Sequence, residues 1–153
     1  MDIGMIGLGR MGANMAERLV RGGHRVVGFA RNASSRRSVE QRGAASAASL
    51  GELVAKLEAP RLLWLMIPAG APVDAAIAEL QSLVSAGDVL VDGGNSNYKD
   101  TLRRAALLAQ KEIHYVDCGT SGGVWGLAEG YSLMIGGDAA AVERLRPIFE
   151  TLA

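Results

Sequence analysis

The chain has 153 residues, long enough for one domain with a sizeable hydrophobic core. Hydrophobic residues make up 49% and charged residues 21%, which is typical of a globular protein in water and excludes a disordered or fibrous chain. The first apolar run, IGMIGLG, is too short and too rich in glycine for a signal peptide or a membrane span. We therefore expect no membrane association.

The cysteine content and the distribution of charge indicate the expected location of the protein and the kinds of ligand it could bind. Cys118 is the only cysteine, so no intrachain disulfide is possible and a reducing cytoplasm is the expected location. We interpret its thiol as a small packed group, because no cation stands beside it in the sequence to stabilise a thiolate. Residues 1–42 contain eight arginines and three acidic residues, a net charge of +5. This excess could solvate a helix face or meet a polyanionic ligand, but basic and aromatic residues do not interleave as nucleic-acid binding would require.

From the N-terminus, the sequence predicts a strand at residues 2–6, a helix at 13–23, a strand at 24–30, helices at 34–44 and 49–57, a strand at 61–67, a helix at 72–87, a strand at 88–94, a helix at 98–112, strands at 113–119 and 131–137, and a helix at 138–152. Ser34 or Ser35 is the expected N-cap of the second helix, Ser96 or Asn97 that of the fifth, and Asp138 that of the last. The alternation predicts a single α/β domain over residues 1–153 with a Rossmann-type, doubly wound, mostly parallel sheet and helices on both faces. Such sheets bind ligands beyond the carboxyl ends of their strands, where the glycine clusters of this chain fall.

The first cluster, GLGRMG at residues 7–12, matches the dinucleotide fingerprint G-x-G-x-x-G. Gly7 would make the tight turn, Gly9 would let a pyrophosphate approach the backbone, and Gly12 would let the helix pack closely on the strand. The free amides at the helix N-terminus would then face the phosphates. A bare structural turn is the alternative, but the position between the first strand and the first helix favours a cofactor site.

The end of the second strand, GFARN, predicts which cofactor binds. An NAD site expects an acid there for the ribose 2′-hydroxyl, whereas this chain has Ala30 followed by Arg31. Because a guanidinium can hold a 2′-phosphate through two hydrogen bonds, we expect NADP, with NAD still possible. Arg36 or Arg37 is a candidate second phosphate contact, unless these arginines only cover a surface loop.

Two further clusters follow later strands. In VDGGNSNYKD, Asn95 carries a donor and an acceptor that could bind the nicotinamide ribose or a substrate hydroxyl, or could serve only the turn. In GTSGGVWG, Ser121 with the amides of Gly122 and Gly123 could form a donor nest for a carboxylate or hydroxyl. A glycine-rich crossover without a ligand is the alternative there.

The segments GLGRMGANMAERL, DGGNSNYKDTLRR, GTSGGVWG and GYSLMIGG together resemble the decarboxylating 6-phosphogluconate dehydrogenases, within the wider β-hydroxyacid dehydrogenase group. The resemblance runs along nearly the whole chain, and SGGVWG in place of SGGEEG is similar to the shorter, bacterial-type branch. Ala30 departs from the family, which places an acid or an asparagine there. The resemblance implies cofactor contacts from Gly7, Leu8, Gly9, Arg10, Met11, Gly12, Arg31, Asn32, Ile67, Pro68, Ala69 and Asn95. It implies substrate contacts from Asn95, Ser121, Gly122 and Gly123.

The resemblance also implies a reaction, the oxidative decarboxylation of 6-phosphogluconate to ribulose 5-phosphate and CO₂ in the pentose phosphate pathway, by a cytoplasmic homodimer or higher oligomer. The lysine and glutamate that catalyse it in the family lie in a segment similar to K-x-x-H-N-x-x-E-Y, beyond the last predicted helix, where the family continues into an all-helical domain. This sequence contains no such segment. We therefore expect a cofactor-binding domain with no catalytic residue and no metal site, which by itself turns over 6-phosphogluconate negligibly.

Two alternatives remain open at this point. One is another β-hydroxyacid dehydrogenase, acting on 3-hydroxyisobutyrate or tartronate semialdehyde, although DGGNS argues against it because those relatives more often carry a serine–threonine pair there. The other is a non-catalytic nucleotide sensor or interaction module, which the missing lysine would suit. Glu129 and Tyr131 lie near the last glycine cluster and are interpreted as loop solvation and loop packing.

Overall fold

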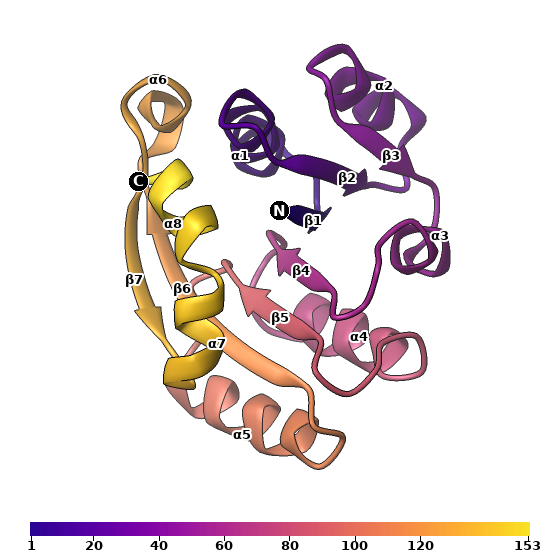
Figure 1. Ribbon diagram of the computed structural model, residues 1–153, viewed down its shortest axis with the longest axis vertical. Helices are drawn as coiled ribbons and strands as arrows, with labels where there is room; N and C mark the ends of the chain where they lie inside the picture. Colours follow the sequence, from indigo (N-terminus) through magenta and orange to yellow (C-terminus); the bar gives the residue numbers. More distant parts are fainter.

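The computed structural model describes all 153 residues and contains one sheet of seven strands, in the order β3-β2-β1-β4-β5-β6-β7 (Figure 1). Neighbouring strands are parallel except β6 and β7, which are antiparallel. The strands are β1 (Asp2–Ile6), β2 (Arg25–Phe29), β3 (Ala45–Ala47), β4 (Leu62–Leu65), β5 (Val89–Asp92), β6 (His114–Ser121) and β7 (Ser132–Gly136). The strand order reverses between β1 and β4, and this switch point is where doubly wound sheets open a ligand crevice.

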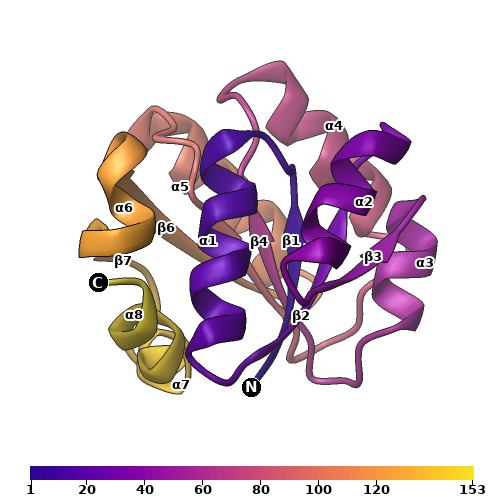
Figure 2. The ribbon, with the colours of Figure 1, turned by 90° about the horizontal axis from the view of Figure 1, so that it is seen from above.

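Helices cover both faces of the sheet (Figures 1 and 2). They are α1 (Arg10–Arg21), α2 (Ala33–Gln41), α3 (Leu50–Ala55), α4 (Ala71–Leu80), α5 (Tyr98–Ala109), the 3₁₀ helix η1 (Gly123–Trp125), α6 (Gly126–Glu129), α7 (Ala139–Arg144) and α8 (Arg146–Leu152). One hydrophobic cluster lies under α1, α2, α7 and α8, and a second lies under α3, α4 and α5. The predicted Rossmann-type α/β fold is therefore confirmed. None of these helices is both long enough and apolar enough to cross a lipid bilayer.

The central strands explain why both faces need covering. All four residues of β4 are buried, so its side chains supply both hydrophobic clusters in alternation. Trp64 is fully buried and meets Phe149 of α8 edge to face, with ring centroids 6.1 Å apart. The apolar stripe of α1, which includes Met15 and Leu19, packs on the same side.

Two elements differ from the predictions. Strand β3 was not predicted, because its three small residues form no apolar run; it is an edge strand that pairs in parallel with β2. The single helix predicted at 138–152 is divided at Leu145 into α7 and α8. Pro147 lacks the amide hydrogen that a continuous helix would need at that position, which accounts for the break.

The helix caps were predicted in part. Asp138 caps α7 and Asn97 caps α5, each through a side-chain oxygen that accepts a backbone amide. The prediction for α2 was wrong, because its N-cap is Asn32 and not Ser34 or Ser35. The Oδ1 atom of Asn32 accepts hydrogen bonds from the amide and the hydroxyl of Ser34, at 2.8 and 2.7 Å.

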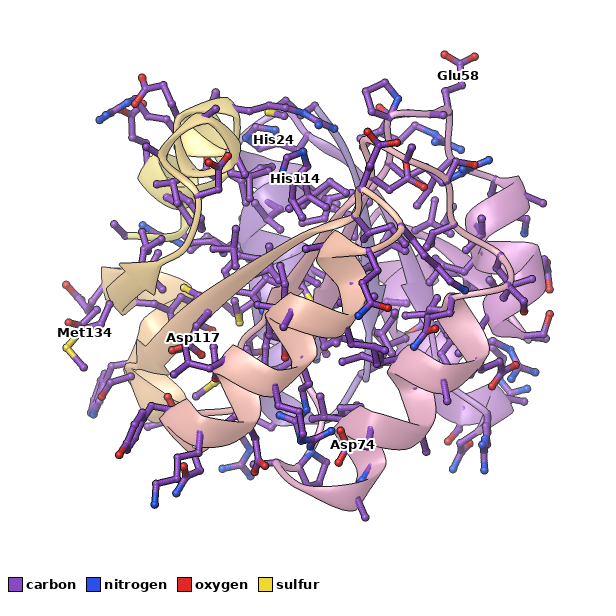
Figure 3. The ribbon with its side chains drawn as sticks, turned by 90° about the horizontal axis from the view of Figure 1, so that it is seen from below. His24, Glu58, Asp74, His114, Asp117 and Met134 are labelled. Atoms are coloured by element: carbon purple, nitrogen blue, oxygen red, sulfur yellow. The ribbon has the colours of Figure 1, made fainter.

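His24 joins the N-terminus to α8 (Figure 3). The terminal ammonium of Met1 lies 3.0 Å from Nδ1 and has only hydrogens to donate, so the ring proton sits on Nε2, which donates to Thr151 Oγ1 over 2.8 Å. Partial burial and the nearby ammonium both lower the pKa of His24 below its ordinary value of 6.5. The folded state therefore favours the neutral form of the His24 ring.

We expect this arrangement to make folding stability depend on pH. Because the pKa of His24 is lower in the folded state than in the unfolded state, the contribution of the neutral ring to folding stability is fully present above about pH 6.5. This contribution is lost as the pH falls toward the lowered value. Urea unfolding between pH 5 and 7 should show a decline in the free energy of unfolding that is smaller in His24→Asn. His114→Asn, which removes the other histidine, should retain the decline; identical profiles for wild type and His24→Asn would contradict the prediction.

Candidate functional site

The turn between β1 and α1 is built around its three glycines. Gly7 has φ +97°, and a Cβ there would lie 2.3 Å from the carbonyl oxygen of Met66. A Cβ on Gly12 would lie 2.1 Å from the carbonyl oxygen of Gly7, so the helix can approach the turn only without a side chain at Gly12. A Cβ on Gly9 would have no atom within 4 Å. The fold itself therefore requires Gly7 and Gly12, whereas Gly9 faces open space.

The N-terminus of α1 is open to an anion. Gly9 is its N-cap and provides no side-chain hydrogen bond, so the amides of the first turn are left for another acceptor. The other residues of the turn play different parts. The side chain of Leu8 is buried against Gly28, Arg10 is exposed, and Met11 is half-buried.

A pocket of about 500 Å³ lies beyond the carboxyl ends of β1, β2 and β4, between α3 and α4. Its twelve lining residues are Ile6, Phe29, Arg31, Ala48, Ser49, Leu50, Ile67, Pro68, Pro72, Ala75, Ala76 and Glu79. Most of the wall is apolar, as a flat aromatic ring would require, and only Arg31 and Glu79 bring charge to it. Glu79 belongs to α4 and does not occupy the end of β2, where an acid would bind a ribose 2′-hydroxyl.

The arginines near this pocket differ in what holds them. Arg31 is exposed and takes part in none of the salt bridges of the chain. The guanidinium of Arg36 donates to the carbonyl oxygens of Ala30 and Arg31, both at 2.8 Å, and so fixes the loop that carries Arg31. Arg37 is exposed on α2. Of the two arginines predicted as a second phosphate contact, Arg36 is therefore engaged by the backbone.

Asn95 connects the loop after β5 with the end of β6. Its φ is +56°, and its Oδ1 atom accepts the amide hydrogen of Thr120 at 3.1 Å. Its Nδ2 atom donates to the carbonyl oxygen of Thr120 at 3.4 Å. The side chain thus pairs with β6 as a peptide group would, and it keeps one N–H and one lone pair for a further partner.

The glycine-rich segment after β6 has two kinds of glycine. A Cβ on Gly122 would lie 2.9 Å from the ring of buried Tyr131, and a Cβ on Gly126 only 2.1 Å from it. These two glycines therefore make room for a side chain of the protein itself. Gly123, with φ +50°, has open space around it, and Ser121 is exposed beside it. The interpretation of Tyr131 as loop packing is confirmed by this contact.

Trp125 and Cys118 lie close in sequence to this glycine-rich segment and differ in their exposure to solvent. Trp125, at the end of η1, is 72% exposed. Cys118 is fully buried, and burial raises the pKa of its thiol to about 12, so it stays protonated at neutral pH. The prediction of a packed thiol is confirmed.

The structure gathers the predicted residues at one edge of the sheet. The turn at 7–12, Arg31, the loop at 67–69 and Asn95 follow the carboxyl ends of β1, β2, β4 and β5 respectively, and Ser121 is the last residue of β6. Ile67 and Pro68 line the pocket with Arg31, whereas Ala69 is exposed outside its wall, and Asn32 uses its side-chain oxygen to cap α2. The arrangement suits an elongated ligand that runs from an apolar, arginine-flanked pocket past the N-terminus of α1.

Two buried charged residues in this region were not predicted from the sequence. Arg104 of α5 is 1% exposed, and Asp92 at the end of β5 is fully buried. A signal was present, since Arg104 lies one helical turn before Leu108 and so on the face of α5 that turns to the core. A charged residue at such a position needs partners, and here they come from α4, from the end of β5 and from two loops of the site.

The family model described as the NAD binding domain of 6-phosphogluconate dehydrogenase matches residues 2–153. The chain belongs to this family. A member from Haloferax volcanii, named as an NAD⁺-dependent decarboxylating 6-phosphogluconate dehydrogenase, is 42% identical over the whole chain, which spans 50% of that protein. The chain spans about half the length, or less, of the curated relatives it matches.

Solved structures of the 6-phosphogluconate dehydrogenase family and its neighbours share the fold. The Plasmodium falciparum 6-phosphogluconate dehydrogenase, solved with NADP⁺ and with 6-phosphogluconate, has a TM-score of 0.93 and 31% identity, covering 100% of this chain and 34% of its own. A Mycobacterium tuberculosis 3-hydroxyisobutyrate dehydrogenase with L-serine has a TM-score of 0.91 and 31% identity, covering 99% of this chain and 52% of its own. The fold is thus common to both enzyme types, while the sequence similarity is higher to the 6-phosphogluconate dehydrogenase from Haloferax volcanii.

Proposed function

We propose that this chain is the cofactor-binding domain of an NADP-dependent 6-phosphogluconate dehydrogenase. The observation that carries the proposal is the combination of an uncapped α1 N-terminus behind an open Gly9 with a pocket flanked by an unpaired Arg31. The amides of α1 would hold the pyrophosphate, and the apolar pocket walls would hold the adenine. When bound, the nicotinamide would accept a hydride from the substrate.

Arg31 supports NADP over NAD. Its guanidinium is held in no salt bridge, and Arg36 fixes the backbone beneath it, so it is poised for a 2′-phosphate. Ala30 offers no carboxylate to the 2′-hydroxyl that an NAD site would bind. The family includes both kinds, since the Haloferax volcanii relative is named as NAD⁺-dependent and the Plasmodium falciparum structure contains NADP⁺.

The substrate half of the proposal rests on the edge formed by Asn95 and Ser121. The free N–H and lone pair of Asn95, the exposed hydroxyl of Ser121 and the open backbone at Gly123 offer donors and acceptors to a sugar acid. The proposed reaction of the whole protein is the oxidative decarboxylation of 6-phosphogluconate to ribulose 5-phosphate, in the cytoplasm and in a homo-oligomer. The lysine and glutamate for the proton transfers are proposed to lie outside these 153 residues.

A 3-hydroxyisobutyrate-type dehydrogenase is the second candidate, supported by the similarity to the Mycobacterium tuberculosis structure. A panel of 6-phosphogluconate, 3-hydroxyisobutyrate and tartronate semialdehyde, offered to the full-length protein with NADP, would separate the two. Turnover of 6-phosphogluconate alone would support our proposal. Binding of NADP without turnover of any of these compounds would instead favour a nucleotide sensor.

Calorimetric titration of the chain with NADP and NAD in parallel tests the cofactor proposal. We expect NADP to bind at least about tenfold more tightly than NAD, because one charged hydrogen-bonding contact contributes about 1.5–3 kcal/mol. No heat of association with either dinucleotide would contradict the assignment of a cofactor site. Tighter binding of NAD would leave the site in place but overturn the role given to Arg31.

A further inference from the structure

The buried guanidinium of Arg104 connects two loops of the site. Its Nη2 atom donates to the carbonyl oxygen of Gly70 at 3.2 Å, at the end of the loop after β4. Its Nη1 atom donates to the hydroxyl of Ser96 at 3.1 Å, in the loop after β5. These loops contain Ile67–Ala69 and Asn95, so a single side chain spans the two segments predicted to contact different parts of one dinucleotide.

Two carboxylates also hold the guanidinium in place, one near Nε and the other near Nη1. Asp74 of α4 accepts a hydrogen bond from Nε at 2.9 Å and lies between α4 and α5 (Figure 3). Asp92 lies 3.6 Å from Nη1 and is itself bound by the hydroxyl of Ser96, by the hydroxyl of Tyr115 at 2.8 Å and by the amide of Gly94 at 2.9 Å. The guanidinium therefore contacts both loops directly, through Gly70 and Ser96, and it also lies beside Asp92, which holds the loop after β5.

The network extends to the remaining loop of the site. Asp92 fixes Gly94 and Ser96, the two residues on either side of Asn95, and Asn95 in turn pairs with Thr120 next to Ser121. Gly94 also packs against the loop after β4, since a Cβ there would lie 2.6 Å from the carbonyl oxygen of Ile67. A displacement of the Asn95 loop would therefore change its distance from both neighbouring loops.

We propose that Arg104 is a positioning residue, which sets the spacing between the loop at 67–70 and the loop at 93–97 so that one dinucleotide can contact both. This inference rests on the proposed function and adds a residue that touches no ligand. A ligand that spans both loops depends on their spacing, whereas a ligand confined to the pocket beside Arg31 contacts only the first loop, through Ile67 and Pro68, and does not depend on the spacing. Loss of Arg104 should therefore discriminate between a whole dinucleotide and its adenosine half.

The test compares Kd values of NADP and of adenosine 2′,5′-bisphosphate by calorimetry. Arg104→Met should weaken NADP binding at least about tenfold and change bisphosphate binding less than about threefold. Ser96→Ala, which removes only the bridging hydroxyl, should shift the same ratio in the same direction by a smaller factor, and it keeps the test decisive if Arg104→Met folds poorly. Arg103→Met is the matched control, because exposed Arg103 also binds Asp74, at 3.0 Å, but contacts neither loop.

The outcomes separate this proposal from the one on which it rests. Equal loss of both ligands in Arg104→Met and in Ser96→Ala would mean that the network only supports the fold, and would overturn the positioning role. Unchanged NADP binding in both variants would overturn it as well. Failure of the wild type to bind either ligand would overturn the proposed cofactor site and this inference together.

Discussion

Replacing Gly12 with alanine is expected to lower the free energy of unfolding by about 3 kcal/mol, whereas Gly9→Ala should lower it by at most about 1 kcal/mol. A methyl group at Gly12 would lie 2.1 Å from the carbonyl oxygen of Gly7, and this backbone atom cannot move without displacing β1 or α1. At Gly9 the methyl group would meet no atom within 4 Å, and φ −64° is open to alanine. Urea unfolding followed by circular dichroism measures both values.

The same pair of variants tests why Gly9 is a glycine at all. If a pyrophosphate lies against its backbone, Gly9→Ala should weaken NADP binding about tenfold or more although the protein remains folded. A destabilised Gly9→Ala would mean that the turn requires glycine for its own packing. A stable Gly9→Ala with wild-type affinity for NADP would remove the pyrophosphate from this turn.

Replacing Arg31 with methionine is expected to abolish the preference for NADP over NAD. The loss of a charged contact to the 2′-phosphate should weaken NADP binding by about 2 kcal/mol, or about thirtyfold, and leave NAD binding nearly unchanged. The fold should be unaffected, because Arg31 is exposed and belongs to no salt bridge of the chain. Parallel calorimetric titrations of wild type and variant measure the change.

A control is needed because Arg31→Met also removes one positive charge. Lys111→Met removes the same charge from an exposed turn after α5, away from the carboxyl ends of the strands. We expect it to change NADP affinity less than about twofold at physiological ionic strength, where exposed charges are largely screened beyond a Debye length. A similar loss in both variants would attribute the effect to net charge and not to a contact with Arg31.

The fold was predictable from the sequence because its main strands are apolar runs that alternate with segments of helical spacing. Residues 2–6 and 61–67 show no polar interruption except glycine and a terminal charge, which indicates strands buried on both faces. Strand β3 offered no such signal, since Ala45, Ser46 and Ala47 are too small to form a pattern and become a strand only by pairing with β2. Pairing with a neighbouring strand, and not local β-propensity, therefore determines whether such a segment forms an edge strand.

The roles of residues in the candidate site were predictable where a sequence motif specifies the conformation of the backbone. They were less predictable where a residue is required by the packing of a side chain from another segment. The roles of Gly7 and Gly12 followed from the fingerprint and agree with the geometry of the turn. The reason for Gly126 did not, because Tyr131 reaches it from outside the helix that carries it. The partners of Arg104 were overlooked because its hydrogen bond to Gly70 joins residues 34 positions apart in the chain, and no spacing rule connects them.

The two tryptophans lie at opposite extremes of solvent exposure, with Trp64 at 0% and Trp125 at 72%. Iodide in solution can reach the indole of Trp125 and cannot reach that of Trp64. The part of the tryptophan fluorescence that iodide quenches therefore reports events at the segment after β6. The part that iodide does not quench reports whether the core is intact. The unlabelled protein thus contains its own pair of optical probes, one for each process.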